Sequence, residues 1–174
     1  MGGEMTKNIE LFPEGLEEYP RSAVLLENIL IFLWIILGTF LISKISLFFR
    51  ILYLSAAMIM ILLVMRRLLC VNCYYYGKRC HVAWGKISSR LYKQGDLDDF
   101  KTCPGQTMAP IFFGLLALIP LVFGLIGLVT SFSLDRALFF SLLVLIILYS
   151  SIPVRKKGCE KCKMRKICPG SAAK

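Results

Sequence analysis

The side chains best suited to chemistry in this sequence are its seven cysteines, six of which fall into two sets of similar spacing. The first set follows the pattern C-x2-C-x6-C and the second follows C-x2-C-x5-C. Two residues between cysteines let both sulfurs reach one metal ion from a single tight turn, and a third cysteine can complete a three-ligand face. The first triad is Cys70, Cys73 and Cys80, the second triad is Cys159, Cys162 and Cys168, and Cys103 lies between them. The spacing therefore predicts metal binding.

The first candidate for the metal is an iron–sulfur cluster. The run CEKCKMRKICPG around the second triad resembles the three-cysteine part of cluster-binding loops in DNA glycosylases and in the auxiliary domains of radical-SAM enzymes. The resemblance implies a cluster whose fourth ligand is Cys103 or a cysteine of the first triad, and proline directly after the last cysteine also occurs in bacterial-type ferredoxins. A four-thiolate cluster is anionic, and Lys161, Lys163, Arg165 and Lys166 would offset its charge.

The alternative metal is structural zinc. The first triad with Cys103 makes a plausible four-cysteine site, and the second triad with His81 makes a site of three thiolates and one imidazole. Together these two sites use every cysteine and the only histidine of the chain. Spacing alone does not distinguish zinc from iron–sulfur, because both favour thiolate ligands.

Two further explanations of the cysteines remain open. Small four-helix membrane enzymes of the disulfide-forming and vitamin K epoxide reductase families couple cysteine pairs to quinone, and the helix count expected here is the same. Their cysteines face an oxidising compartment, whereas the cysteines here are expected on the cytoplasmic side, where disulfides rarely persist. The other explanation is a group of reduced cysteines without a ligand. No catalytic residue is assigned, and whether the chain is an enzyme stays open.

The elements that would position these cysteines are membrane-spanning helices. The chain is 57% hydrophobic and only 18% charged. Its apolar residues lie in four blocks, at 23–43, 47–65, 110–130 and 137–152. About 20 helical residues cross the hydrocarbon of a bilayer, and isolated strands cannot satisfy their backbone groups in lipid. The sequence predicts an all-α integral membrane protein with a four-transmembrane-helix bundle.

The short turns between blocks divide the chain into five segments, and two of these segments are helical hairpins. The five segments are a polar N-terminal segment at 1–22, hairpins at 23–67 and 110–153, a cysteine-rich loop at 68–109 and a basic, cysteine-rich tail at 154–174. Each triad directly follows a hairpin, and Cys-Pro-Gly occurs at both 103–105 and 168–170. This pattern suggests an internal duplication, whose pseudo-two-fold axis would bring the triads together.

The positive charge predicts orientation. All but three of the 21 Lys and Arg residues fall on the side that carries both termini and the central loop, so the positive-inside rule makes that side cytoplasmic. We therefore expect a multi-pass protein of the cell membrane with both termini in the cytoplasm. The net charge of +10 is explained by topology and by contact with anionic headgroups rather than by nucleic-acid binding.

Several local features are also predicted. Trp84 to Lys93 has the spacing of an amphipathic helix in the headgroup plane, and the tyrosines at 74–76 suit an interfacial aromatic belt. Pro120 is expected to bend the third span, and Pro153 to end the fourth. Glu27 lies early in the first span, where it could relay protons or sit at headgroup depth.

The leading functional hypothesis is a membrane-anchored iron–sulfur protein. It would pass electrons between an acidic cytoplasmic partner and a quinone-type membrane carrier or a partner subunit, and a homo-oligomer is compatible with the sequence. The alternatives are a non-enzymatic scaffold or accessory subunit whose cytoplasmic part is folded by zinc, and a quinone-linked thiol oxidoreductase. The sequence contains no phosphate-binding loop, nucleophile motif or H-E-x-x-H pair.

Overall fold

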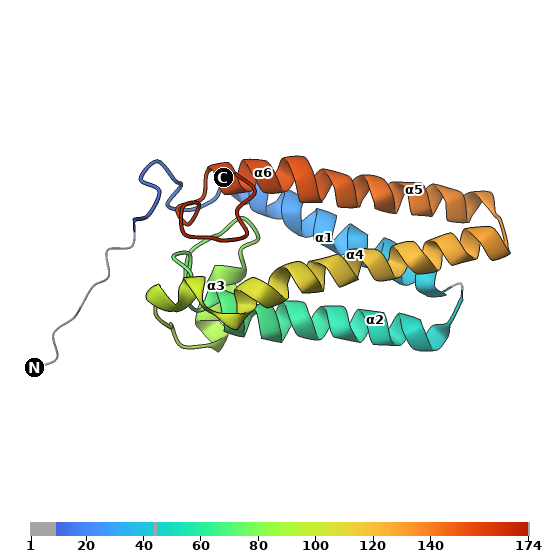
Figure 1. The fold of residues 1–174 in the computed structure, drawn as a ribbon, viewed down its shortest axis with the longest axis horizontal. Helices are drawn as coiled ribbons and strands as arrows, with labels where there is room; N and C mark the ends of the chain where they lie inside the picture. The colour runs from blue at the N-terminus through green and yellow to red at the C-terminus, as the bar shows by residue number, and fades with distance from the viewer. Residues whose placement is uncertain (1–9, 44, 174) are drawn as a thin grey trace, which may run out of the picture.

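The computed structural model describes residues 10–43 and 45–173, and its long helices lie side by side in one elongated bundle (Figure 1). Helix α1 spans Arg21–Ser43, and α2 spans Leu47–Ile59 and continues through π-helical turns at Met60–Val64 and Arg66–Cys70. Helix α4 spans Pro104–Thr130. Helix α5 spans Leu134–Tyr149 and passes through a π-helical turn at Ser150–Val154 into α6, Arg155–Glu160. The described residues contain no β-strand, only one isolated bridge.

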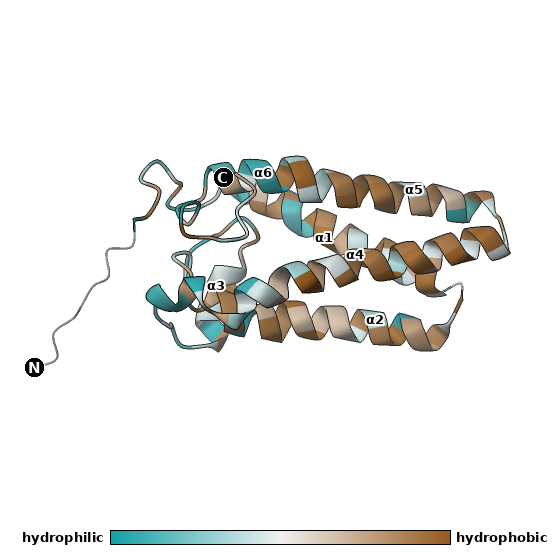
Figure 2. Cartoon of the chain, viewed as in Figure 1, coloured by the Kyte–Doolittle hydropathy of each residue, from teal (hydrophilic) through white to brown (hydrophobic). Residues whose placement is uncertain are grey.

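Four of these helical stretches are long and apolar enough to cross a membrane, as the sequence predicts. Apolar residues cover the length of the bundle, whereas polar residues gather at one end (Figure 2). Large apolar side chains are turned outward along the helices; Phe48 is 70% exposed and Val129 80% exposed. A soluble surface rarely carries so continuous an apolar face, but hydrocarbon would cover it without cost.

Helix α1 occupies the centre of the bundle and packs against α2, α4 and α5. Its buried side chains include Trp34 and Ile42, which meet Ala57 of α2 and Leu143 of α5 in one apolar core. These contacts explain why α1 has the largest buried fraction of the four helices. The first helix of the chain is therefore the one against which the other three pack.

Proline positions account for the differences between the predicted and observed helix bounds. Helix α4 begins at Pro104 rather than near residue 110, because proline suits the first turn of a helix, where its missing N–H leaves no bond unmade. The expectation that Pro153 ends the fourth span is wrong. Pro153 lies inside the π-helical turn, and the helix continues to Glu160. A π-helical turn already departs from the i→i−4 bonding pattern, so proline is tolerated there.

Pro120 lies inside α4, and the bundle compensates for the hydrogen bond that it removes. A proline at this position leaves the carbonyl of Leu116 without its backbone donor. The Tyr53 hydroxyl donates to that oxygen at 3.1 Å and the Trp34 indole N–H donates to it at 3.3 Å. Because no water is present in hydrocarbon, such replacement donors are what make a buried proline tolerable. Helices α1 and α2 are thereby tied to α4.

Apart from the short connections between α1 and α2 and between α4 and α5, the chain outside the long helices gathers at one end of the bundle (Figure 1). We call this assembly the cap and define it as residues 10–20, 71–103 and 161–173. It contains the short helix α3, Trp84–Leu91, and a 3-10 turn at Asp98–Lys101. Trp84 is buried and stacks on Phe113 of α4, with ring centroids 6.4 Å apart. The cap is therefore packed directly onto the ends of the membrane-length helices.

Candidate functional site

The cap joins three segments that are distant in the sequence. Leu16 and Cys162 form a parallel bridge, in which the Leu16 N–H donates to the Lys161 carbonyl at 2.9 Å. The Phe12 N–H donates to the Lys163 carbonyl, also at 2.9 Å. A side chain at Gly15 would meet the Lys163 backbone at 2.6 Å, so only glycine permits this approach. The N-terminal segment is thus laid along the turn that carries the second triad.

Two tyrosines link the segments at this end of the molecule. Tyr75 joins the central loop to the N-terminal segment and to the turn of the second triad, and Tyr19 joins the N-terminal segment to α6. The Tyr75 hydroxyl donates to the Leu16 carbonyl at 2.7 Å and accepts from the Lys163 N–H at 3.1 Å. The Tyr19 hydroxyl donates to the Gly158 carbonyl at 2.6 Å. Tyr75 is only 2% exposed, which places it in the cap core rather than in the expected interfacial belt. Both tyrosines therefore act as internal links of the cap.

The first triad starts at the bundle and runs into the cap. Cys70 is the last residue of the helical stretch that begins with α2, and it is buried in the apolar core of the bundle. Cys73 packs in the separate core of the cap, and Cys80 touches both cores. Burial raises the pKa of the Cys73 thiol well above its usual value, and the nearby thiols of Cys80, Cys70 and Cys162 raise it further.

The second triad is held on the tail. Cys159 lies in α6, and the Cys162 N–H donates to its carbonyl at 3.2 Å in the turn that follows. The Cys168 N–H donates to the Met164 carbonyl at 2.7 Å. Burial raises the pKa of the Cys162 thiol to about 11, and the thiols of Cys159 and Cys168 act in the same direction. The second triad therefore follows a helix end and the two hydrogen-bonded turns after it.

One cysteine of each triad packs against the same small core. Cys73 and Cys162 both lie against the core formed by residues that include Tyr19, Tyr75 and Met164. Cys103 is buried, and its thiol donates to the Phe100 carbonyl at 3.2 Å. Phe100 belongs to the same core. The structure thus brings all seven cysteines to one end of the bundle, with members of both triads around one shared core.

His81 lies between the triads. Its ring meets the edge of the Tyr19 ring at a centroid distance of 5.4 Å. A Cβ atom at Gly158 would lie 2.8 Å from the His81 ring, so the glycine before Cys159 makes room for the imidazole. Burial lowers the pKa of His81, which keeps the imidazole neutral at physiological pH. A neutral imidazole is the form that can bind a metal.

The thiols of the cap are ligands that suit a soft metal, but in the structure they do not point toward one common metal position. None of the seven cysteines forms a disulfide. Within residues 10–43 and 45–173, no three His, Cys, Asp or Glu side chains meet in a geometry that could hold a metal ion. Buried thiols with raised pKa values stay protonated without a cation, and a metal must displace those protons to bind. Metal binding at this place therefore requires the thiols to move closer together.

The basic tail is partly neutralised by the N-terminal segment. Lys163 pairs with Glu17 at 2.8 Å, and Lys166 pairs with Glu10. Hydrogen bonds from Lys163 and Tyr74 hold the pKa of the Glu17 carboxyl at about 2. Two of the four cations expected to balance a cluster are therefore engaged by carboxylates. Sequence reasoning did not identify this role of the N-terminal segment, although its acidic composition beside a basic tail was a usable signal.

A further polar contact within the membrane-length helices involves Glu27. Glu27 of α1 is only 8% exposed, and the Ser150 hydroxyl donates to its Oε1 atom at 3.4 Å. Ser150 begins the π-helical turn after α5. The neighbouring Asn28 amide donates to the carbonyls of Val24 and Val82 at 2.7 and 3.2 Å. Glu27 is therefore a buried side chain that faces the π-helical turn after α5.

Comparison of the chain with models of known protein families, with curated proteins and with solved structures found no match.

Proposed function

We propose that this membrane protein binds metal through cysteines of both triads, beside the cap core against which Cys73 and Cys162 both pack. The observation that carries the proposal is that two thiol sets from distant parts of the sequence lie around one packed core. Incidental cysteines are buried singly as small apolar side chains. Seven thiols at one end of a bundle, six of them in metal-ligand spacing, favour ligation instead.

An iron–sulfur centre that transfers electrons is the form of the proposal that we put first. Cys70 lies in the core of the bundle, and Cys73 lies in the core of the cap. A cluster held between them would be within a short distance of both a membrane carrier of quinone type and an acidic partner docked on the cap. The cluster would supply one-electron chemistry, while Tyr19 and Tyr75 would hold the ligand-bearing segments in place and keep water out.

A zinc-folded scaffold is the second candidate, and a different observation favours it. The N-terminal segment, the loop and the tail are joined by the Leu16–Cys162 bridge and by the two Tyr75 hydrogen bonds. A single ion bound at this junction would fix all three segments, as structural zinc does in small domains. In this form the cap would present a rigid surface and the protein would carry no redox activity.

The topology completes the proposal. We infer that the cap faces the cytoplasm, on the basis of the Lys and Arg count. The internal duplication is supported by the π-helical turns, because α2 and α5 both lead directly into such a turn before their triads, at Met60–Val64 and Ser150–Val154. Such turns are frequent at functional sites.

The test is metal and sulfide analysis of protein purified in detergent without oxygen, with an absorption spectrum. About four iron and four sulfide per chain with a broad band near ~400 nm would indicate a four-iron cluster. Roughly one or two zinc ions per chain in a colourless protein would indicate the zinc-folded scaffold. Metal-free protein after iron and zinc reconstitution, or a reversible Cys73–Cys162 disulfide in its place, would contradict the proposal.

Variants make the test specific to the junction. Cys73→Ser and Cys162→Ser should each lose most of the bound metal, because each removes a ligand from a different triad. Met164→Leu is the matched control: Met164 is 2% exposed in the same core, and its replacement conserves volume without touching a thiol. If the control loses as much metal as the serine variants, packing and not ligation explains the result.

A further inference from the structure

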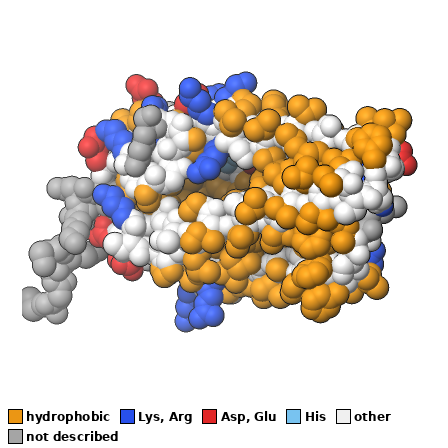
Figure 3. Space-filling view, turned by 45° about the vertical axis from the view of Figure 1, so that its right-hand side comes forward, with side chains coloured by type: hydrophobic (Ala, Val, Ile, Leu, Met, Phe, Trp, Pro, Cys, Tyr) orange, Lys and Arg blue, Asp and Glu red, His pale blue; other side chains and the backbone are white. Residues whose placement is uncertain are grey.

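A cleft lies where the first turns of α1 meet the end of α5 and α6. Its volume is about 520 Å³. One half is lined by apolar groups of Ala23, Leu26, Tyr149 and Pro153, and the other half by His81, Lys157 and Lys161. The two halves follow the boundary between the apolar surface of the bundle and the charged end of the molecule (Figure 3). The cleft therefore has an apolar end beside the helices and a charged end beside the cap, which matches the acyl chains and headgroup of a lipid.

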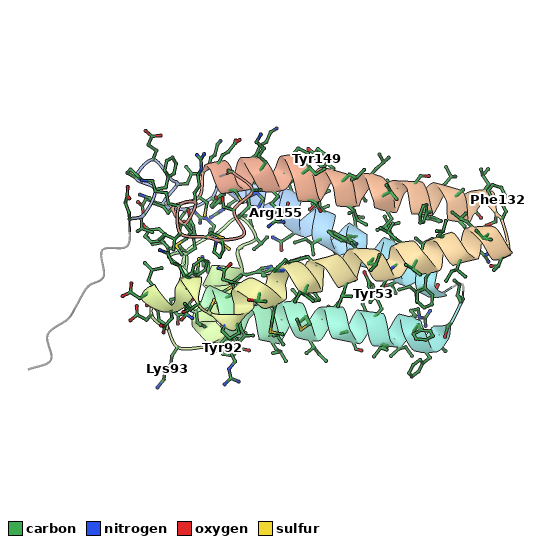
Figure 4. The ribbon with its side chains drawn as sticks, viewed as in Figure 1. Tyr53, Tyr92, Lys93, Phe132, Tyr149 and Arg155 are labelled. Atoms are coloured by element: carbon green, nitrogen blue, oxygen red, sulfur yellow. The ribbon has the colours of Figure 1, made fainter. Side chains whose placement is uncertain are left out.

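The apolar half is open toward the lipid-facing surface. Leu26 is 44% exposed and Tyr149 is 50% exposed, and Tyr149 extends outward from α5 (Figure 4). Both residues lie in helical stretches that are long and apolar enough to cross a membrane. Hydrocarbon lying along these side chains would remove them from water, which is favourable in proportion to the area covered.

The polar half carries two lysines that have no ion-pair partner among the described residues. Lys163 and Lys166 are paired with Glu17 and Glu10, but within the described residues neither Lys157 nor Lys161 forms an ion pair. Glu160 also lines the cleft, so the two ammonium groups leave one net positive charge there. His81 lies in the same lining and has ring N–H chemistry that can donate to a phosphate oxygen. The first turn of α1 borders this half and contains no acidic residue.

We propose that this cleft binds one anionic phospholipid. The phosphate lies between the ammonium groups of Lys157 and Lys161, and an acyl chain lies along Leu26 and Tyr149. A zwitterionic lipid gains less, because its headgroup cation cancels the attraction to the lysines. Neither lysine that would hold the phosphate is a candidate metal ligand, so substitution of the lysines tests the lipid site without removing a metal ligand.

The experiment measures lipid binding to the purified full chain in detergent by native mass spectrometry. Phosphatidylglycerol should occupy one site more tightly than phosphatidylcholine. The double variant Lys157→Gln with Lys161→Gln should weaken that site roughly 30-fold, because each lysine near a membrane surface contributes about a fivefold gain in affinity. The control pair Lys86→Gln with Lys93→Gln removes the same charge from exposed positions of the loop, and Lys93 lies on the opposite side of the cap (Figure 4). The control should bind as the wild type does.

Three outcomes would overturn the proposal. Equal weakening by both lysine pairs would show general attraction to charge and no site. Equal binding of phosphatidylcholine would show that the phosphate charge is not recognised. Competition by millimolar inorganic phosphate, with no loss in a Leu26→Asn variant, would show a free-phosphate site without an acyl part. Loss of the lipid in Leu26→Asn, together with resistance to inorganic phosphate, supports a lipid site.

Discussion

The two triads have almost the same spacing, yet different parts of the molecule hold them. The first triad begins with Cys70, which is fixed in the core of the bundle by the helix that carries it. The second triad also begins at a helix end, with Cys159 in α6, but its next turn is held by other segments. The Leu16 N–H donates to the Lys161 carbonyl, and the Lys163 N–H donates to the Tyr75 hydroxyl. The first cysteine of one triad is thus fixed in the bundle core, whereas the turn around Cys162 is held by contacts of the cap. A centre that uses both therefore depends on the docking contacts as much as on the cysteines.

The largest effect is expected from removing the main docking contact. Tyr75→Ala should destabilise the docked tail by about 3 kcal/mol, because it leaves a cavity and two unpaired backbone groups. Hydrogen exchange followed by mass spectrometry should show loss of protection in residues 161–168, with residues 47–70 unchanged. Tyr76→Ala is the control, since the Tyr76 hydroxyl donates only within the loop, to the Tyr92 carbonyl at 2.6 Å. Equal exchange in both variants would show that Tyr75 does not hold the tail.

A difference in thiol reactivity should distinguish the triads in metal-free protein. Alkylation requires the thiolate, and a pKa of about 11 leaves roughly one thiol in a thousand ionised at pH 8. Cys162 should therefore react slowly, with a rate that rises about tenfold per pH unit up to pH 10. Burial raises the pKa of the Cys73 thiol well above its usual value, so Cys73 should react more slowly still. Mass spectrometry of iodoacetamide-treated peptides gives both rates. A Cys73 rate equal to that of Cys162 would remove the distinction between the triads.

The smallest effect concerns Glu17, which pairs with the tail from the N-terminal segment. Its pKa is about 2 in the folded cap, below the ordinary 4.5, so the folded cap binds this proton more weakly than the unfolded chain does. The contribution is fully present above pH 4.5 and is lost as the pH falls toward 2. Pepsin cleavage of the tail should accelerate over this range in the wild type. Glu17→Gln should flatten that dependence; an identical profile would contradict the role of the pair.

Much of the fold could be predicted because long apolar runs leave few alternatives. The four membrane-length helices follow from residue types alone, and their bounds differ from expectation mainly at Pro104 and Pro153. Helix ends depend on local hydrogen bonding, which hydropathy does not report. A proline can begin a helix or lie in a widened turn as readily as it can end one.

The candidate site was predictable only in part. The cysteine spacing indicates which residues could act together, and the repeated order of hairpin and triad indicates that they could share one end. The contributions of Gly15, Leu16 and Tyr19 could not be predicted, because no periodic pattern marks a segment that docks through backbone atoms. The fit of the His81 ring against Gly158 is likewise a product of tertiary packing, and a lone glycine in a basic tail gives no sign of it.

The contact between the N-terminal segment and the tail also constrains how the protein is made. Pro13 and Lys163 are 150 positions apart, and the Lys163 ammonium donates to the Pro13 carbonyl at 3.2 Å. A ribosome releases residues 12–16 long before it reaches residues 161–163, so the earliest part of the cap must wait while every intervening helix is synthesised. Completion of the cap therefore reports that the whole chain has been made. A chain arrested before Lys161 would leave residues 12–16 without their partner and exposed to proteases of the quality-control machinery.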